Sequence, residues 1–402
     1  MSPSSVMDAA LLLLALVALL PAVTLFAEVV AAVSRPPRRA PVAPGDVRSA
    51  RLAVLMPAHD EAAGIAATIG SVLPQLGPCD RLLVVADNCT DDTAALARVA
   101  GAEVIERRDP QRRGKGYALD FGVRWLERDA PDVLVMVDAD CLLSAGALEC
   151  LAICSAASAR PAQALYLMHA PSPASIGQRI AAFAWLVKNK LRPLGAAALG
   201  WPCQLMGTGM AFPWPLIREA RLASSHLVED MQLGLDLAEA GAAPLFCPDA
   251  LVTSTFPSDA DGTRSQRTRW EHGHLSVIAT VAPRLLGRAL TRRDGSLAAM
   301  VLDLIVPPLA ALVLLTVALA LLEVVWWLFG GSAWPLVLSA AGLGLLAVAV
   351  ALAWGREGRS IVSLPELLGL PLYVAGKIPL YLRLLTRRQV EWVRTKRDER
   401  SR

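Results

Sequence analysis

Residues Val133 to Cys141, which read VLVMVDADC, decide the fold of this chain. The run begins with five apolar residues, and an unbroken valine-rich run is typical of a strand buried on both faces of a parallel sheet. Such a sheet binds ligands at the carboxyl ends of its strands, and here Asp138 and Asp140 stand at that end. If the segment stays extended, alternation turns both carboxylates to the same side.

Two carboxylates at this position are candidate ligands for a divalent metal. Hard oxygen ligands suit Mg²⁺ or Mn²⁺ bridging to phosphates, so Asp138 and Asp140 are predicted to bind one of these ions. The alternative is an acidic turn that caps the next helix. The D-x-D pattern alone is common, and the rest of the chain has to decide between the two.

The composition favours a membrane protein with a soluble part. The chain has 402 residues, of which 54% are hydrophobic and 19% charged, and the apolar excess is concentrated in a few segments. A net charge of +3 is too small to suggest nucleic-acid binding. The seven cysteines are an odd number and show no C-x-x-C pair, which indicates reduced thiols in a cytosolic domain.

Three apolar stretches are long enough to cross a membrane: Ala9–Ala27, Leu304–Leu322 and Trp334–Trp354. No basic region precedes the first stretch, which disfavours a signal peptide. Arginines flank each stretch on one side, and the positive-inside rule places those sides in the cytoplasm. This predicts an outside N-terminus and a helical hairpin whose tip, Gly330-Gly331-Ser332, also lies outside.

The stretch Ile361–Leu385 is apolar but interrupted by Pro365, Pro371 and Pro379. The chain beyond it is strongly basic, and a membrane crossing here would place that charge outside, against the positive-inside rule. We therefore predict an interfacial or re-entrant segment on the cytoplasmic leaflet. A fourth span is the alternative.

Between the membrane segments, short apolar runs alternate with helix-like stretches from Arg51 to about Phe256. This β-α-β-α order is typical of an α/β domain with a mostly parallel sheet and right-handed crossovers. The four predicted strands are residues 52–56, 82–86, 103–106 and 133–137.

Six short motifs follow one another on this domain, and several stand directly after a predicted strand. Each is weak alone, whereas the order D-x-D, E-D, Q-x-x-R-W is specific. The motifs are Pro57-Ala58-His59-Asp60-Glu61, Asp87-Asn88-Cys89-Thr90-Asp91-Asp92-Thr93, Arg113-Gly114-Lys115-Gly116, Asp138-Ala139-Asp140, Glu229-Asp230 and Gln266-Arg267-Thr268-Arg269-Trp270.

This ordered set resembles the membrane-embedded family 2 glycosyltransferases, such as cellulose synthase, hyaluronan synthase and poly-N-acetylglucosamine synthase. The resemblance covers residues 51 to about 289, with flanking membrane segments in compatible places. It implies a GT-A fold that transfers a sugar from a UDP-sugar with inversion and uses Mg²⁺ or Mn²⁺. It also assigns donor binding to Pro57, Glu61, Asp87, Lys115, Asp138 and Arg269, and acceptor binding to Gly207, Thr208, Glu229, Gln266 and Trp270.

Several of these residues also have a structural interpretation. Asp87 could cap the helix that begins near Thr93, Glu61 could be a helix-start acid, and Lys115 could lie in a solvated basic turn. The string R-x-R-W would by itself suggest a basic patch at the membrane surface. A mobile loop, Ser258 to Thr263, is predicted before it.

Asp230 is the predicted catalytic base. Inverting transfer needs one carboxylate that takes the proton from the attacking hydroxyl, and the resemblance assigns this role to Asp230. The alternative is an acidic first turn favoured by the helix dipole, which would make Glu229 and Asp230 equally tolerant of change. Val228 stands where the family motif often has threonine, a mild departure.

Three further features have two interpretations each. His272 and His274 form an H-x-H that could bind metal, although no carboxylate partner is evident nearby. The amphipathic stretches Ile176–Leu194 and His274–Leu290 could be core helices. Their basic faces favour interface helices that dock the catalytic domain under the membrane hairpin.

Together these observations predict an α/β GT-A domain on helical membrane segments. The predicted parts are an N-terminal transmembrane helix (8–33), a linker (34–50), the cytoplasmic catalytic domain (51–256), the Q-x-x-R-W loop with an interface helix (257–296), two transmembrane helices (297–329 and 333–354), the interfacial segment (361–385) and a basic cytoplasmic tail (386–402).

The predicted function is transfer from UDP-glucose or UDP-N-acetylglucosamine to a hydroxyl in exopolysaccharide synthesis, at the cytoplasmic face of a bacterial inner membrane. Three spans are fewer than synthases that secrete their own polymer have, so export would need a homo-oligomer or a partner. One alternative is a membrane-lipid acceptor, since ceramide-type glucosyltransferases share Q-x-x-R-W. Another is a non-catalytic membrane assembly subunit.

Overall fold

The computed structural model describes residues 2–34, 50–224, 228–256 and 260–381, with the side chains of 260–267 left out. The described chain divides into two compact units. The sheet unit lies within residues 37–171 and 200–270, and the helical unit lies within residues 1–36, 172–199 and 271–389. The predicted linker and basic tail fall almost entirely outside the described residues.

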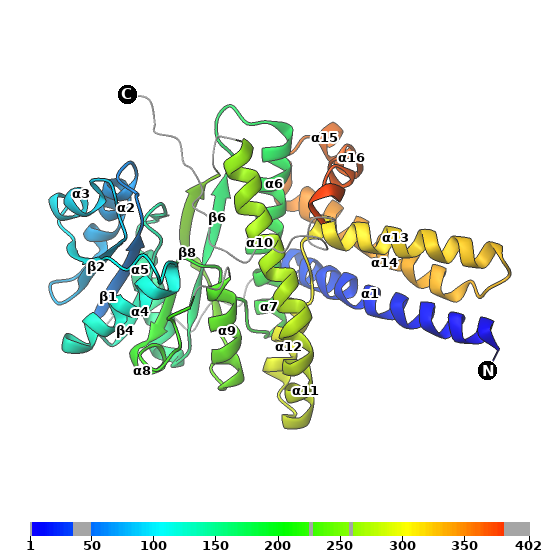
Figure 1. Cartoon of the computed structure of the whole chain (residues 1–402), viewed down its shortest axis with the longest axis horizontal. Helices are drawn as coiled ribbons and strands as arrows, with labels where there is room; N and C mark the ends of the chain where they lie inside the picture. Colours follow the sequence, from blue (N-terminus) through cyan, green and yellow to red (C-terminus); the bar gives the residue numbers. More distant parts are fainter. Residues whose placement is uncertain (1, 35–49, 225–227, 257–259, 382–402) are drawn as a thin grey trace. The chain divides into compact units, whose positions relative to one another are not determined.

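The sheet unit holds one eight-stranded sheet in the order β3-β2-β1-β4-β7-β6-β8-β5 (Figure 1). The first four strands are parallel, β7 is antiparallel to β4 and β6, and β6 is parallel to β8. All four predicted strands are confirmed, with ends that differ by at most two residues. The strands are β1 Leu52–Ala58, β2 Arg81–Asp87, β3 Glu103–Arg107, β4 Val133–Met136, β5 Leu142–Leu143, β6 Ala162–His169, β7 Met210–Pro213 and β8 Leu245–Thr255.

The sheet is buried because its central strands are apolar on both faces. All four residues of β4 are buried, as the unbroken valine-rich run predicts. At Gly122 a Cβ atom would lie 2.3 Å from Leu55 Cδ1, so glycine lets helix α4 approach β1 closely. The helices of this unit are α2 Ile65–Val72, α3 Thr93–Val99, α4 Lys115–Leu126, α5 Ala147–Ser158, α8 Trp214–Ile217 and α9 Glu229–Glu239.

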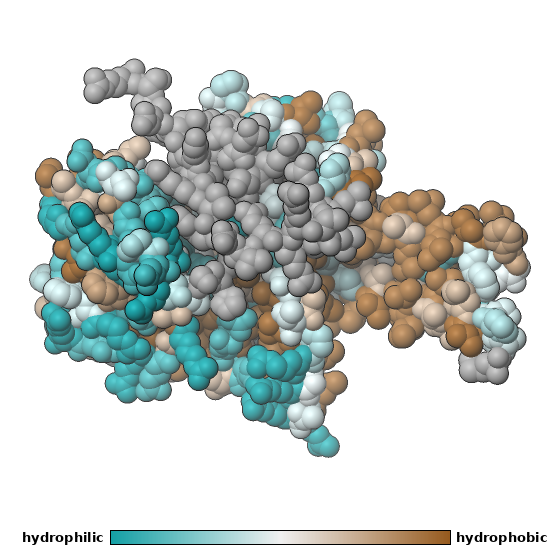
Figure 2. Space-filling view, in the orientation of Figure 1, coloured by the Kyte–Doolittle hydropathy of each residue, from teal (hydrophilic) through white to brown (hydrophobic). Residues whose placement is uncertain are grey.

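Three helices of the helical unit are long and apolar enough to cross a membrane: Pro3–Ser34 (α1), Leu309–Leu328 (α13) and Trp334–Gly358, which is α14 (Trp334–Ala353) with the π-helical turn η4 (Trp354–Gly358). Figure 2 shows hydrophobic residues covering these helices. The predicted second stretch began at Leu304, but α13 begins later because Pro307 and Pro308 interrupt the helix.

The tip of the α13–α14 hairpin is fastened to the start of α1. Asp8 Oδ1 accepts hydrogen bonds from the Trp326 indole nitrogen at 2.7 Å and from the Ser332 backbone nitrogen at 2.9 Å. The indole of Trp326 is therefore engaged inside the unit. Trp327 and Trp334 are exposed.

The predicted stretch Ile176–Leu194 forms α6 (Ile176–Leu186), a π-helical segment η3 (Val187–Leu191) and α7 (Arg192–Leu199). Three of its four basic residues pair with acids of the same unit. Arg179 contacts Glu366, Lys190 Nζ lies 3.0 Å from Glu357 Oε2, and Arg192 pairs with Glu28 and Asp303. These three side chains therefore do not form a free basic face directed at lipid headgroups.

Arg192 holds three helices together. Its Nε lies 2.7 Å from Glu28 Oε2 on α1, and its Nη2 lies 2.5 Å from Asp303 Oδ1 on α12 (Gly295–Leu304). The exposed fractions of the three side chains are 8%, 0% and 11%. A buried charge is tolerated when it is paired and hydrogen-bonded, and here one cation serves two acids.

Arg192→Met should destabilise the protein by about 3–5 kcal/mol, because two acids would stay buried without their cation. Lys190→Met is the matched control, since its pair with Glu357 is more exposed and should be worth about 1 kcal/mol or less. Thermal unfolding of the purified protein in detergent measures both. Equal losses for the two variants would contradict the role given to Arg192.

The remaining helices bear on two predictions made from the sequence. Helix α10 (Ala260–Thr280) contains Ala260–Thr263, so the four described residues of the predicted loop Ser258–Thr263 are helical; residues 257–259 lie outside the description. Within residues 361–381, the described part of the predicted interfacial segment, the helices Leu364–Leu368 and Leu370–Ala375 are far shorter than the about 20 residues that a span needs. The other helices are α11 Ala282–Arg292, α15 Leu364–Leu368 and α16 Leu370–Ala375.

Candidate active site

The D-x-D motif lies in a turn directly after β4. The backbone nitrogen of Cys141 donates to the carbonyl of Asp138 at 3.1 Å, so the segment is not extended as the sequence suggested. The turn nevertheless gathers its side chains: ligand atoms of Asp138, Asp140 and Cys141 lie within 4.8 Å of one another. Two partly exposed carboxylates so close together fit a hard divalent cation.

Three hydroxyl groups hold this turn in place. The Thr208 hydroxyl accepts from the Asp138 nitrogen at 3.0 Å, the Thr68 hydroxyl donates to the Ala139 carbonyl at 2.8 Å, and the Ser254 hydroxyl lies 3.3 Å from Asp140 Oδ2. Thr208 is fully buried, which suits a support for the turn better than the acceptor contact expected of it. No sequence pattern near Thr68 or Ser254 pointed to this role.

Lys115 lies at the start of α4, after Gly114 with φ 131. Its Nζ lies 2.5 Å from Asp138 Oδ1 and 4.0 Å from Glu229 Oε1, and it donates to the Gly207 carbonyl at 2.6 Å. Burial would lower the pKa of Lys115, but the carboxylates of Asp138 and Glu229 outweigh it and raise the pKa above its ordinary value. The ammonium therefore stays charged beside the D-x-D turn.

Glu229 and Asp230 open α9, as the sequence predicted. Burial, opposed by Lys115 and reinforced by Asp230, raises the pKa of Glu229 to about 7. Gly207 has φ +92, and a Cβ atom there would stand 3.4 Å from Asp230 Oδ2 and 3.8 Å from Lys115 Nζ. The structure thus brings together five predicted site residues from four separate parts of the sequence: Lys115, Asp138, Gly207, Glu229 and Asp230.

Glu229 should make stability depend on pH. Its folded pKa of about 7 exceeds the ordinary carboxyl value of about 4.3, so its contribution is complete at low pH and is lost as pH rises through about 7. We expect the melting temperature of Glu229→Gln, relative to wild type, to rise between about pH 4.5 and pH 7.5. A difference that stays constant over this range would show that the folded and unfolded pKa values are alike.

Asp87 ends β2, and its carboxylate is already paired. Arg107 Nη1 lies 2.7 Å from Asp87 Oδ1, and the Asn88 amide donates to the same oxygen at 3.0 Å. Arg107 also lies over the ring of Tyr117, 5.6 Å from its centroid. Arg107 was missed from the sequence; the available signal was that β2 and β3 end on residues of opposite charge, which the parallel register places side by side.

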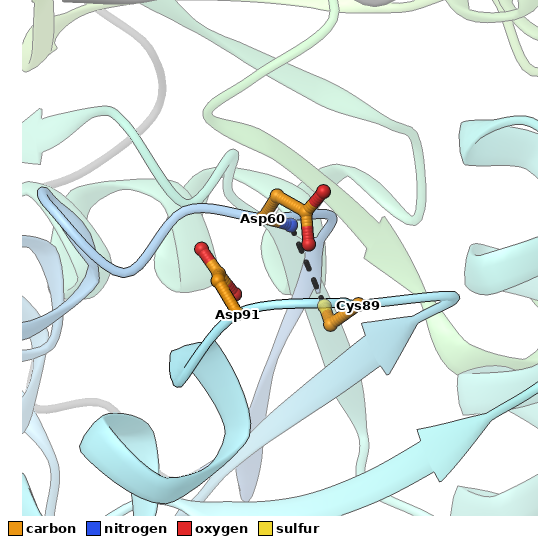
Figure 3. A group of neighbouring side chains, drawn as sticks. All are labelled: Asp60, Cys89 and Asp91. Carbon is orange, nitrogen blue, oxygen red and sulfur yellow. Dashed lines mark hydrogen bonds between the residues drawn. The ribbon is translucent and has the colours of Figure 1, made fainter. Parts of the chain in front are cut away.

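The loops after β1 and β2 bring Asp60, Cys89 and Asp91 together (Figure 3). Asp60 Oδ1 accepts from the Thr90 nitrogen at 2.6 Å, and Asp91 Oδ2 accepts from the Ala62 nitrogen at 3.2 Å. These carboxylates therefore join the two loops. Pro57 lies near the end of β1, and the Glu61 nitrogen donates to the Thr93 hydroxyl at 2.8 Å, which places both at the same edge of the sheet.

A cavity of about 390 Å³ lies beside Asp230. One wall is α9 and another is the segment of residues 221–224, which passes close to the start of α4. The cavity is lined by Gly116, Leu119, Met210, Arg221, Leu222, Ala223, Ser224, Glu229, Asp230, Gln232, Leu233 and Asp236.

The rest of the predicted site lies on α10. Arg269 and Trp270 are half-buried there, and the side chain of Gln266 is outside the described residues. His274 is buried, 2.9 Å from the Leu304 carbonyl, and burial lowers its pKa to about 3. Within the described residues, neither His274 nor His272 belongs to a group that could hold a metal, which favours the structural interpretation of H-x-H.

A family model described as "Glycosyltransferase like family 2" matches residues 50–273. Curated relatives named glucosyl-3-phosphoglycerate synthase, from Mycolicibacterium paratuberculosis and Mycobacterium tuberculosis, are 39% and 37% identical over 95 residues. That match covers 22% of this chain and 28% of each relative, so the chain spans under a third of their length.

A solved structure of similar fold is a mannosyltransferase from Pyrobaculum calidifontis in complex with GDP-Man and Mn²⁺. The two chains are 17% identical with a TM-score of 0.54, and the alignment covers 95% of this chain and 99% of the other. At this identity the likeness concerns the fold, which is the mostly parallel α/β architecture predicted from the sequence.

Proposed function

The chain belongs to glycosyltransferase-like family 2, and on that premise we propose that it transfers a hexose from a UDP-sugar to a hydroxyl acceptor with inversion. The observation that carries the proposal is the cluster of Asp138, Lys115 and Asp230 at the carboxyl end of β4, beside a cavity. Such a cluster offers a place for a diphosphate, a cation and a proton acceptor within one small region.

The chain's own residues divide the work. Asp230 takes the proton of the acceptor hydroxyl, whose oxygen then attacks the anomeric carbon as the bond to the diphosphate breaks. Lys115 exchanges its contact with Asp138 for the diphosphate and neutralises part of the charge that UDP carries away. Asp138 and Asp140 would hold Mg²⁺ or Mn²⁺, which supplies Lewis-acid stabilisation of the leaving diphosphate.

The names of similar proteins support the proposed donor and the proposed metal. The names of the curated relatives include a glucosyl product, and the mannosyltransferase of similar fold was solved with Mn²⁺. UDP-glucose or UDP-N-acetylglucosamine is the donor that we propose. Asp87 and Arg107, paired at the ends of β2 and β3, would flank the uracil base, and Glu61 would lie at the nucleotide. Arg269 would contact the donor beside the departing UDP, whereas Gln266 and Trp270 would contact the acceptor.

We place the activity in exopolysaccharide synthesis at the cytoplasmic face of a bacterial inner membrane. Three helices of sufficient length and apolarity and the arginines that flank them support this placement. A polymer channel would require a homo-oligomer or an export partner.

The predicted topology can be tested with a cysteine introduced at Arg397. This cysteine should be labelled in sealed inside-out vesicles, where the cytoplasmic side is exposed, and labelling from the outside of the membrane would overturn the topology.

A membrane-lipid acceptor is the second candidate, favoured by the short helices α15 and α16, which expose Leu368 and Leu372. The test of the whole proposal is to incubate the purified protein with a panel of UDP-sugars and measure UDP release, followed by mass spectrometry of the products. Asp230→Asn, which should be slower by at least about 10²-fold, is the control. UDP binding without release from any donor, with membrane acceptors present, would favour a non-catalytic assembly subunit instead.

A further inference from the structure

We infer that the acceptor is an uncharged sugar ring and that the cavity beside Asp230 rejects phosphorylated or carboxylated acceptors. The inference rests on the proposed function, because it takes Asp230 as the group that meets the acceptor hydroxyl. It concerns a property that the family does not fix, which is the charge of the molecule that receives the sugar.

The charge of the cavity wall carries the inference. Glu229, Asp230 and Asp236 all line the cavity, and Arg221 is the one cation among its described lining residues. The ammonium of Lys115 is near, but it already pairs with Asp138 at 2.5 Å and would be occupied by the diphosphate in the reaction. Asp230 and Asp236 alone outnumber Arg221, so an anionic acceptor would meet an excess of like charge, which is unfavourable.

The polar groups of α9 suit hydroxyls instead. Gln232 Nε2 donates to Asp236 Oδ1 at 2.7 Å, which orients both side chains along the wall. Carboxylate oxygens accept hydrogen bonds from sugar hydroxyls without needing a charged partner. The side-chain amide of Gln232 adds a donor and an acceptor. An uncharged polyhydroxy ligand thus satisfies the wall that an anion would oppose.

Part of the cavity lining is apolar, and the cavity is small. Leu119, Met210, Leu222 and Leu233 line it and offer packing for the C–H groups of a sugar ring. The volume of about 390 Å³ lies near the lower end of the range of about 300–1,000 Å³ for ligand pockets. This suits one ring of a longer acceptor rather than a whole chain.

The acceptor inferred for this chain differs in charge from that of its curated relatives. Those relatives are named for a product that contains 3-phosphoglycerate, whose phosphate and carboxylate are anionic. A cavity wall with three acids and one arginine is a poor match for such an acceptor, so the local sequence similarity does not carry the acceptor over to this chain.

The experiment compares an alkyl hexoside with its 6-phosphate as acceptors for one UDP-sugar, with wild type, Asp236→Lys and Asp249→Lys. Asp249 is exposed on β8 and does not line the cavity, so the control makes the same charge change elsewhere. We expect wild type and Asp249→Lys to favour the neutral acceptor in kcat/KM by at least about tenfold. Asp236→Lys should reduce that preference by about tenfold, since like charge is replaced by attraction.

Two neutral acceptors distinguish a soluble sugar from a sugar carried on a membrane lipid. A soluble methyl hexoside and a long-chain hexoside in vesicles carry the same ring, and transfer to either supports the inference. Equal or better use of the phosphorylated acceptor by wild type would overturn it, as would an equal effect of Asp249→Lys. UDP binding and UDP release are measured in parallel: their absence counts against the proposed function, whereas transfer only to the anion counts against this inference alone.

Discussion

Asp230→Asn should lower the rate of transfer by at least about 10²-fold while UDP-sugar binding is largely retained, because a general base contributes about 10²–10⁴ to rate. The asparagine keeps the size and hydrogen bonding of the side chain but cannot take the proton from the acceptor. A Cβ atom at Gly207 would lie 3.4 Å from Asp230 Oδ2, and the ion pairs that Lys115 forms within 4.0 Å are with Asp138 and Glu229. The loss should therefore appear in kcat rather than in donor affinity.

Glu229→Gln is the matched control for this result. Glu229 lies one residue earlier on the same helix turn and 4.0 Å from Lys115, and its raised pKa of about 7 means that the neutral form is already well populated. The amide variant should cost much less in kcat. Equal small losses at both positions would return the pair to the simpler interpretation of an acidic first turn, and the base would have to be sought elsewhere.

Asp138→Ala and Asp140→Ala should each abolish turnover and weaken Mn²⁺ binding, while the protein stays folded and membrane-inserted. Two carboxylates converge at the D-x-D turn, and removing one leaves the diphosphate without most of its counter-charge. Calorimetric titration of Mn²⁺ in the presence of UDP measures the metal directly, independently of activity.

Ser254→Ala provides a graded control for the metal prediction. Its hydroxyl lies 3.3 Å from Asp140 Oδ2 and is not itself one of the predicted ligands. Loss of a group that orients a ligand typically costs about 10–100-fold in metal affinity, so this variant should bind Mn²⁺ more weakly but still turn over. Near-normal activity of Asp140→Ala with an unchanged metal requirement would show that the metal assignment is wrong.

Much of the sheet unit could be predicted because its signals are local. The strands β1 to β4 are short apolar runs bounded by polar residues, and each was found within two residues of its predicted ends. The start of α9 at Glu229 was likewise visible from the acidic pair and the helical periodicity that follows. The conformation of the D-x-D turn was not, because alternation describes only a segment that stays extended, and here a backbone hydrogen bond folds it.

The sequence by itself determined the strands β1 to β4, the three apolar helices and the residue types that gather at the strand ends, since these depend on neighbouring residues and on periodicity. Only the tertiary structure decided which distant groups meet. Arg192 meets Glu28 across 164 residues, and Lys115 meets Gly207 across 92. The reason is physical. Charged groups and hydroxyls reach their partners only after the apolar faces have packed, and neighbouring residues in the sequence do not show which faces pack together.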